Sequence, residues 1–188
     1  RRIMAFSVSQ FRSKGIARGG ARPNLFQTTL TNVPAGVPIP VGSSEGGWSF
    51  VCKIASIPAS TIAAVEVPYF GRQVKVPGNR TFDNLSVTVI NDEGFDVRNG
   101  LETWMARMNG HQSNTQTVDP NDLLASMSVI HYGKEGQNTT IGDGVWTFEN
   151  IFPVSLGEIA LDWGSNDAIE EYTVEFAYDY WSHGPRTN

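Results

Sequence analysis

Strict alternation of side-chain types characterises the segment Glu171-Tyr172-Thr173-Val174-Glu175-Phe176-Ala177-Tyr178-Asp179-Tyr180-Trp181. Large apolar and aromatic side chains occupy positions 172, 174, 176, 178 and 180, and three acids lie among the intervening positions. This period of two predicts a β-strand, because a helix would bring residues three or four apart onto one face. The aromatic face suits a core, and the acidic face must meet water, a basic partner or a wet channel. A long strand near a chain end also needs neighbours along its edges or it becomes an open edge, which raises the question of assembly.

Length and composition indicate a single globular domain. The chain has 188 residues, enough for its own core, and only 18% of them are charged. Much of the surface is therefore left to Ser, Thr, Asn and Gly, which suits broad contacts between subunits. The net charge of -5 argues against ordinary nucleic-acid binding, because a protein that neutralises phosphates is usually basic.

The single cysteine, Cys52, excludes a disulfide within the chain. It lies in the apolar run 48–54, where alternation places it on one face with Trp48, Phe50 and Ile54. A buried structural thiol is the predicted role.

Residues 1–23 are polar and rich in glycine and arginine, and they predict a flexible basic arm with a short helix near 8–14. Six cations lie in this arm: Arg1, Arg2, Arg12, Lys14, Arg18 and Arg22. Two interpretations remain open, a solvated tail and an arm that docks on an acidic neighbouring subunit. The segment predicts no signal peptide, because no apolar stretch follows the first residues, and no stretch of the chain predicts a membrane span.

The rest of the chain predicts one domain, residues 24–182, followed by an extension at 183–188. Strands are expected at 24–33, 48–57, 64–69, 72–76, 83–91, 124–132, 145–156, 158–161 and 171–181. The third and fourth of these form a hairpin around Phe70-Gly71. One helix is expected at about 93–108, with Asp92 as its N-cap, Gly110 after its end and an apolar face of Phe95, Val97, Leu101, Trp104, Met105 and Met108. The fold class is therefore mainly β, an antiparallel β-sandwich or rolled β-barrel with one α-helix.

The sequence contains no pattern that indicates catalysis. The histidines, at 111, 131 and 183, are far apart, and no nucleophile motif, metal-binding motif or phosphate loop is present. We therefore expect no enzyme activity, no cofactor and no metal. Arg80, close to Asp83 at the start of a strand, is expected to pair with a carboxylate or with carbonyl groups, either within the fold or across a subunit contact.

Several segments carry a family resemblance. They are Ala21-Arg22-Pro23-Asn24-Leu25-Phe26-Gln27, Pro77-Gly78-Asn79-Arg80-Thr81-Phe82-Asp83, Val87-Thr88-Val89-Ile90-Asn91-Asp92-Glu93, Leu156-Gly157-Glu158-Ile159-Ala160-Leu161-Asp162-Trp163 and Asp179-Tyr180-Trp181. In this order the set resembles the tail tube protein of T-even-like contractile-tailed bacteriophages. The basic arm, the loop at 33–47 and the segment 183–188 are longer than in that family.

The resemblance implies a structural virion protein whose inner sheet completes a hexameric β-barrel ring. Such rings stack into a hollow tube that conducts the genome during ejection. The implied partners are further copies of the chain, the tail sheath, the tape-measure protein, the baseplate and the tail terminator. Double-stranded DNA would pass without specific binding, and no membrane anchor is implied. Assembly would take place in the host cytoplasm.

The resemblance also gives the candidate residues their roles. Candidate acids facing the lumen are Glu171, Glu175, Asp179 and Glu66, since an acidic or neutral channel repels phosphate. Candidate contacts between subunits are Arg12, Lys14, Arg18, Arg22, Arg80 and Asp83.

Two alternatives stay open at this point. The nearer is the tube of a related contractile injection system or bacteriocin that carries no genome. The other is a monomeric carbohydrate-binding β-sandwich, in which Trp146, Trp163 and Trp181 would serve as sugar platforms.

Overall fold

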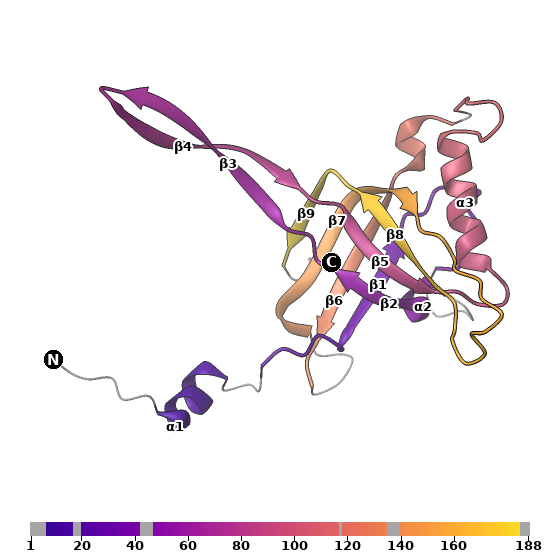
Figure 1. The fold of residues 1–188 in the computed structure, drawn as a ribbon, viewed down its shortest axis with the longest axis horizontal. Helices are drawn as coiled ribbons and strands as arrows, with labels where there is room; N and C mark the ends of the chain where they lie inside the picture. Colours follow the sequence, from indigo (N-terminus) through magenta and orange to yellow (C-terminus); the bar gives the residue numbers. More distant parts are fainter. Residues whose placement is uncertain (1–6, 17–19, 42–46, 117, 135–139, 185–188) are drawn as a thin grey trace.

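The computed structural model describes residues 7–16, 20–41, 47–116, 118–134 and 140–184. Figure 1 shows a β-rich body from which a long hairpin and the N-terminal arm project. The strands are β1 Phe26–Thr31, β2 Cys52–Ser56, β3 Ser60–Tyr69, β4 Arg72–Phe82, β5 Leu85–Ile90, β6 Ala125–Tyr132, β7 Thr140–Leu156, β8 Glu171–Ala177 and β9 Tyr180–His183. The helical elements are α1 Val8–Gln10, the π-helical turn η1 Phe11–Gly15, α2 Trp48–Val51, α3 Asp96–Met108 and the 3-10 turn η2 Pro120–Leu123.

All strand pairs are antiparallel, and seven strands form one continuous sheet system in the order β1-β6-β7-β8-β5-β2, with β9 added to β7. The long strand β7 belongs to both parts of this sheet system, one formed with β1, β6 and β9 and the other formed with β8, β5 and β2. Its first part pairs with β6 as far as Ile151, and its last residues, 152–156, pair with β8. The predicted mainly-β, rolled antiparallel class is thus confirmed. Strands β3 and β4 form a separate two-stranded hairpin, as predicted, but one longer than the expected 64–76.

The alternation that predicts the final strand corresponds to β8. Tyr172, Val174 and Phe176 are buried opposite Val89, Val87 and Leu85 of β5, whereas Glu171, Thr173 and Glu175 are exposed. The predicted single strand 171–181 is wrong beyond Ala177. There the chain turns, with the Asp179 amide donating to the Glu149 carbonyl at 3.2 Å, and continues as β9 on the edge of β7. Tyr180 is consequently 53% exposed rather than part of the core.

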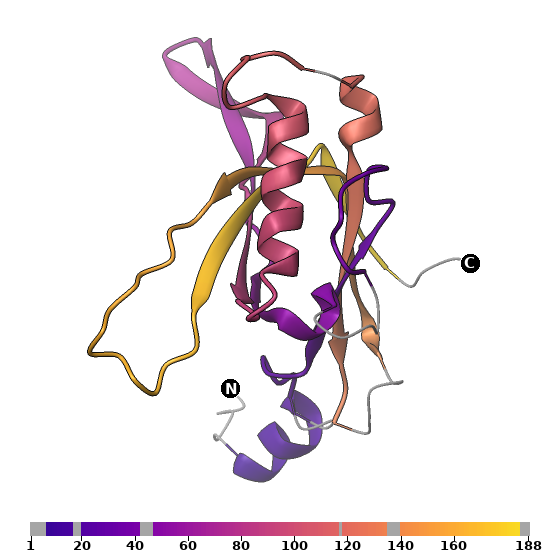
Figure 2. The same ribbon diagram turned by 90° about the vertical axis from the view of Figure 1, so that its right-hand side faces the viewer.

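Helix α3 lies across one side of the sheets (Figure 2) and buries Val97, Leu101 and Trp104 against them. The Trp104 indole donates a hydrogen bond from Nε1 to the Leu123 carbonyl at 2.8 Å, which satisfies its polar atom inside the core. The predicted start at 93 with Asp92 as N-cap is wrong. Phe95 has a left-handed backbone with φ 53° and donates to the Asp92 carbonyl at 2.9 Å, so a tight turn precedes the helix.

Two predicted strand segments are also wrong. Trp48–Val51 is a helical turn, because the Gly47 carbonyl accepts from the amides of Phe50 and Val51. Trp48 is therefore buried while Phe50 is 67% exposed, and they do not share a face as predicted. Residues 158–161 belong to a loop, 157–170, between β7 and β8, and they pair with no strand in the described part of the chain.

The predicted arm and extension are partly described. The expected short helix near 8–14 is present as α1 and η1. His183 ends β9 opposite Trp146, and residues 185–188 of the predicted extension lie outside the described residues.

Candidate functional site

One face of the sheet β2-β5-β8-β7 is open and polar. Glu171, Thr173 and Glu175 alternate along β8 on this face, and the Thr173 and Thr88 hydroxyls lie 3.5 Å apart across the strand pair. Lys53 of β2 reaches across β5 and places Nζ 2.5 Å from Oε1 of Glu171. The opposite face is buried under α3 and the core. The open face therefore has small hydroxyls and carboxylates along its centre.

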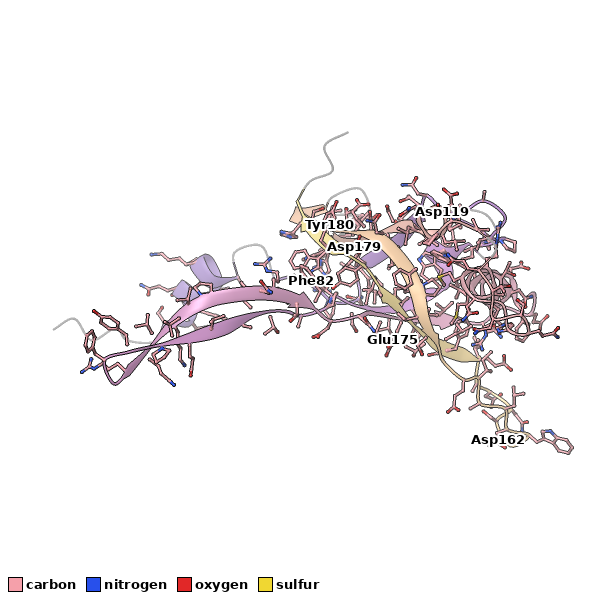
Figure 3. All side chains as sticks on the ribbon, turned by 90° about the horizontal axis from the view of Figure 1, so that it is seen from above. Phe82, Asp119, Asp162, Glu175, Asp179 and Tyr180 are labelled. Atoms are coloured by element: carbon pink, nitrogen blue, oxygen red, sulfur yellow. The ribbon has the colours of Figure 1, made fainter. Side chains whose placement is uncertain are left out.

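The four predicted lumen acids fall into three places. Glu171 and Glu175 lie together on the open face, and Glu175 has no ion pair or hydrogen bond of its side chain within the described ranges. Asp179 lies in the turn after β8, where Oδ2 accepts from Asn150 Nδ2 at 2.6 Å (Figure 3). Glu66 lies on the hairpin, 3.7 Å from Lys75. The structure thus brings together only the first two.

Lys53 was not predicted as part of this face. Its ion pair with Glu171 is exposed, with side chains 48% and 34% accessible, and contributes at most about 1 kcal/mol. The main effect of Lys53 is on the charge of the open face, because its ammonium group offsets one of the two carboxylates there. No local pattern signals the pair, which depends on the order of the strands in the sheet.

The open-faced sheet has two unpaired edges among the described residues. Strand β2 pairs only with β5, and residues 152–156 of β7 pair only with β8. Each edge exposes backbone donors and acceptors that can pair with another chain. Because the edges lie on opposite sides of the same sheet, one copy can offer β2 to the 152–156 edge of the next.

The hairpin β3–β4 projects well away from the body (Figure 1). One of its faces is apolar. The register pairs Val65 with Val76 and Val67 with Val74 on this face, and the exposed fractions of the four valines lie between 45% and 52%. The other face carries the pair Glu66–Lys75. We call the four valines together with Tyr69 the valine face.

The base of the hairpin is anchored on the body by aromatic packing. Phe82 contacts the rings of Tyr178 and Trp181 at centroid distances of 5.9 and 6.4 Å. The Tyr178 hydroxyl donates to the Asp83 carbonyl at 2.8 Å, and burial together with the nearby Asp83 charge raises the pKa of Tyr178. These contacts hold the projecting hairpin in a defined direction.

The two polar residues predicted near this base have different environments. Asp83 makes its hydrogen bonds through its backbone. Its carbonyl accepts from the Tyr178 hydroxyl, and its amide donates to the Ala59 carbonyl at 3.2 Å. Arg80 lies on β4 opposite Ile62 of β3, and it has no ion pair or side-chain hydrogen bond within the described part of the chain. The expected partner of Arg80 is therefore not found within the described fold, and a subunit contact stays a prediction.

The N-terminal arm exposes apolar and cationic side chains together. Val8 and Phe11 are 68% and 54% exposed, and Arg12 and Lys14 are exposed beside them. Arg22 is also exposed, and Arg18 lies outside the described residues.

The loop 157–170 is a further surface, which the sequence did not predict as a contact. Leu161 is 80% exposed, Trp163 101% and Ile169 71%. Both stems are fixed: Arg98 Nη1 donates to the Gly157 carbonyl at 2.7 Å, and Asn91 Nδ2 donates to Glu170 Oε2 at 2.9 Å. One feature of the sequence could have indicated this surface: the segment between the two strands contains a tryptophan and four acids but no cation.

The tryptophans of the sugar-platform alternative do not form one surface. Trp146 and Trp181 are half-buried in the sheet system, and Trp163 lies on the loop. Cys52 is half-buried rather than buried as predicted, and desolvation raises the pKa of its thiol to about 11, so the thiol is protonated near neutral pH. Its structural role stays a prediction. Within the described ranges, no group of three or more His, Cys, Asp or Glu side chains is arranged to hold a metal ion. Nor does any described helix have the length and apolar character needed to cross a membrane.

Comparisons with known proteins agree on one kind of molecule. Residues 21–184 match the family described as "Phage tail tube protein". The chain is 30% identical over 161 residues to "Tail tube protein gp19" of Enterobacteria phage T4, covering 86% of this chain and 90% of that protein. It is 28% identical over 177 residues to "Tail tube protein" of Serratia phage KSP90, covering 92% of this chain and 94% of that protein.

Solved structures of tube assemblies share the fold. A chain of the sheath-tube complex of an extracellular contractile injection system, PVC, in its extended state superposes with a TM-score of 0.62 at 16% identity, covering 95% of this chain and 98% of that one. A chain of the anti-feeding prophage baseplate superposes with a TM-score of 0.61 at 14% identity, covering 87% and 95%.

Proposed function

Because this chain belongs to the phage tail tube protein family, we propose that six copies close into a ring whose channel is lined by the sheet β2-β5-β8-β7. The protein is a structural component of a contractile phage tail and not an enzyme. The relatives at 28–30% identity are phage proteins, whereas the injection-system tubes, at 14–16%, share the fold alone. The alternative of an injection device without a genome is therefore not favoured.

The observation that carries the ring is the pair of unpaired edges on one open-faced sheet. Joining β2 of one copy to residues 152–156 of the next would satisfy both edges, and repeating the step around a closed ring leaves no edge of this sheet exposed. Antiparallel or parallel pairing at the joint would each use the backbone groups that are free in the single chain.

The open face supports a channel for DNA that does not hold it. Glu175 and the Glu171–Lys53 pair give this face no excess of positive charge, and the hydroxyls of Thr88 and Thr173 add none. Such a surface avoids the counterion-releasing contacts that bind phosphate tightly. Asp179 and Glu66 lie away from the acids on the open face of β8, and we place them at the ends of the channel rather than on its wall.

Each face of the sheet suggests a different set of partners. With the open face inward, α3 faces outward and is proposed to meet the tail sheath. Chains of the same fold are found in a sheath-tube complex, a tube terminator and a baseplate, which supports sheath, terminator and baseplate as partners here. The tape-measure protein and passing double-stranded DNA are proposed as occupants of the channel.

The N-terminal arm is proposed to dock on a neighbouring copy. Its exposed Val8 and Phe11 supply apolar area, and Arg12, Lys14 and Arg22, with Arg18, supply charge that suits the acidic body. Replacing these four cations with Ala is expected to slow or prevent polymerisation while the monomer stays folded. Long tubes formed by that variant would contradict the role of the arm.

Electron microscopy of the purified protein tests the proposed function. The protein would be concentrated alone and, separately, with purified baseplates. Hollow tubes or six-fold rings are expected, and a map of the tubes should show β8 at the channel wall. Monomers under both conditions would overturn the tube and favour a monomeric binding module.

A further inference from the structure

The valine face of the hairpin has no cover in the single chain. Every residue from 59 to 77 is exposed, and β3 and β4 pair with each other and with no other strand among those described. A two-stranded hairpin is marginally stable alone in water, and a continuous apolar stripe on it marks a surface for contact. The hairpin therefore needs a partner that covers Val65, Val67, Val74 and Val76.

The loop 157–170 offers matching apolar side chains. All residues from 160 to 169 are exposed, including Leu161, Trp163 and Ile169. The anchored stems at Gly157 and Glu170 present these side chains without a large cost in chain entropy. An exposed tryptophan on a held loop has the properties of a binding anchor.

The two surfaces cannot meet within one molecule. The hairpin and the loop project from opposite ends of the body, as Figures 1 and 3 both show, with Asp162 at the end remote from the hairpin. A contact between them must join two copies head to tail. Contacts of this kind generate rings or helical arrays, whereas a two-fold contact stops at a dimer.

Charge favours the same pairing. The hairpin carries three cations, Arg72, Lys75 and Arg80, and one acid, Glu66. The loop carries four acids, Glu158, Asp162, Asp167 and Glu170, and no cation. Arg72 and Arg80 have no ion pair among the described residues, and neither do Glu158 and Asp167. Opposite potentials of this kind set partner choice and register between surfaces.

We infer that the valine face of one copy packs on the 157–170 loop of the next, with Trp163 as the apolar anchor and with Arg72 and Arg80 near Glu158 and Asp167. The inference rests on the proposed tube, since it names the surfaces that join neighbouring copies. It also gives a role to two features that ring closure through β2 and β7 leaves unused. The occupant is a second copy of this chain, because the 157–170 loop of another copy carries exposed apolar side chains and acids that complement the valines and cations of the hairpin.

Cross-linking between two labelled populations tests the contact. In a Cys52→Ser background, one population carries Val74→Cys on the valine face and the other carries Ser165→Cys beside Trp163. After mixing, assembly and treatment with a short bismaleimide, the cross-linked dimer is expected at least about tenfold above a control in which Gln112→Cys, in an exposed loop, replaces Ser165→Cys. Dimer at the control level in tubes that microscopy shows to be intact would overturn the contact and leave the proposed function standing.

Charge reversal gives a second, independent test. Glu158→Lys with Asp167→Lys, or Arg72→Glu with Arg80→Glu, is expected to raise the protein concentration needed for assembly about tenfold or more. Combining both sets in one chain should restore most of the loss, and the exposed Asp122→Lys should change little. Asp162 is left intact because its Oδ1 accepts from the Gly164 amide at 2.9 Å within the loop. Full assembly by both reversed variants would overturn the contact, whereas failure of the unaltered protein to form tubes with baseplates would count against the proposed function itself.

Discussion

Arg98 on α3 donates a hydrogen bond from Nη1 to the carbonyl oxygen of Gly157 at 2.7 Å. Its Nε also donates to Glu102 at 2.9 Å, and its guanidinium lies 5.0 Å from the ring centroid of Tyr172. One side chain therefore ties the helix, the end of β7 and the face of β8 together. The same bond fixes the first stem of the 157–170 loop.

Arg98→Met is expected to lower the free energy of unfolding by about 1–3 kcal/mol, because a half-buried carbonyl loses a charged donor and Tyr172 loses its cation. Urea denaturation followed by circular dichroism measures the change. Glu102→Gln is the control, since it weakens only the pair between residues four apart, in which the Glu102 side chain is exposed, and should cost less than about 0.5 kcal/mol. Equal losses in both variants would contradict the bridging role of Arg98.

Gly157→Ala is expected to destabilise the fold, because a Cβ at this position would lie 2.8 Å from the backbone oxygen of Thr173. Backbone atoms of β8 cannot move aside easily, so a loss of about 1–3 kcal/mol is expected in urea denaturation. Gly164→Ala provides a matched control in the same loop, where the nearest atom would be at 3.5 Å, an ordinary contact. A Gly157→Ala variant as stable as Gly164→Ala would show that the strand and loop separate readily.

Gly100→Ala should also destabilise the protein, although alanine favours helices over glycine by about 1 kcal/mol. The added Cβ would lie 2.5 Å from Ile39 Cγ1 and 3.2 Å from the Ile39 backbone, so close packing of α3 on this segment outweighs propensity. Asn99→Ala, one residue earlier on the exposed side of the helix, should be neutral or slightly stabilising. Thermal unfolding of the two variants measures the difference, and a higher midpoint for Gly100→Ala would contradict the close contact.

Stability should fall at alkaline pH in a way that depends on Cys52. Burial raises the pKa of the thiol from 9.0 to about 11, so between these values the unfolded chain loses the proton while the native chain keeps it. The free energy of unfolding therefore decreases as pH rises through this window and is unaffected well below pH 9. The difference between the unaltered protein and Cys52→Ala, measured by urea denaturation at several pH values, should change across the window. A constant difference would mean that the thiol is accessible to water in the native state.

Glu175→Lys should leave tail assembly intact and slow DNA release, because a cation on the channel wall would bind phosphate. Phage carrying the variant would be examined by electron microscopy and by the rate of dye-detected DNA release at low and high salt. The defect is expected to shrink at high salt as the charge is screened. Asp122→Lys, away from the open face, is the control. Normal release by Glu175→Lys at low salt would contradict the position of β8 at the channel.

The side-chain periods of β8, β5 and α3 could be read from the sequence because each depends on residues close together along the chain. Val174 and Phe176 are buried as predicted, as are Leu85 and Val87, and so are Leu101 and Trp104. The same reasoning failed for Trp48–Val51 and for residues 158–161. Both segments have apolar residues at suitable spacing, but a strand also requires a neighbouring edge, and the sequence does not say whether one is available.

The amino-acid sequence by itself determined the mainly antiparallel β class, the single long helix and the hairpin around Phe70-Gly71, since local periodicity and turn residues specify these elements. Only the tertiary structure decided that β7 pairs with β6 along its first part and with β8 along its last, and that Lys53 reaches Glu171 across β5. It also decided that the valine face and the 157–170 loop stay uncovered at opposite ends of the body. Periodicity reports which side chains share a face. Whether that face is buried, open to a channel or left for another copy depends on contacts between residues distant in the chain.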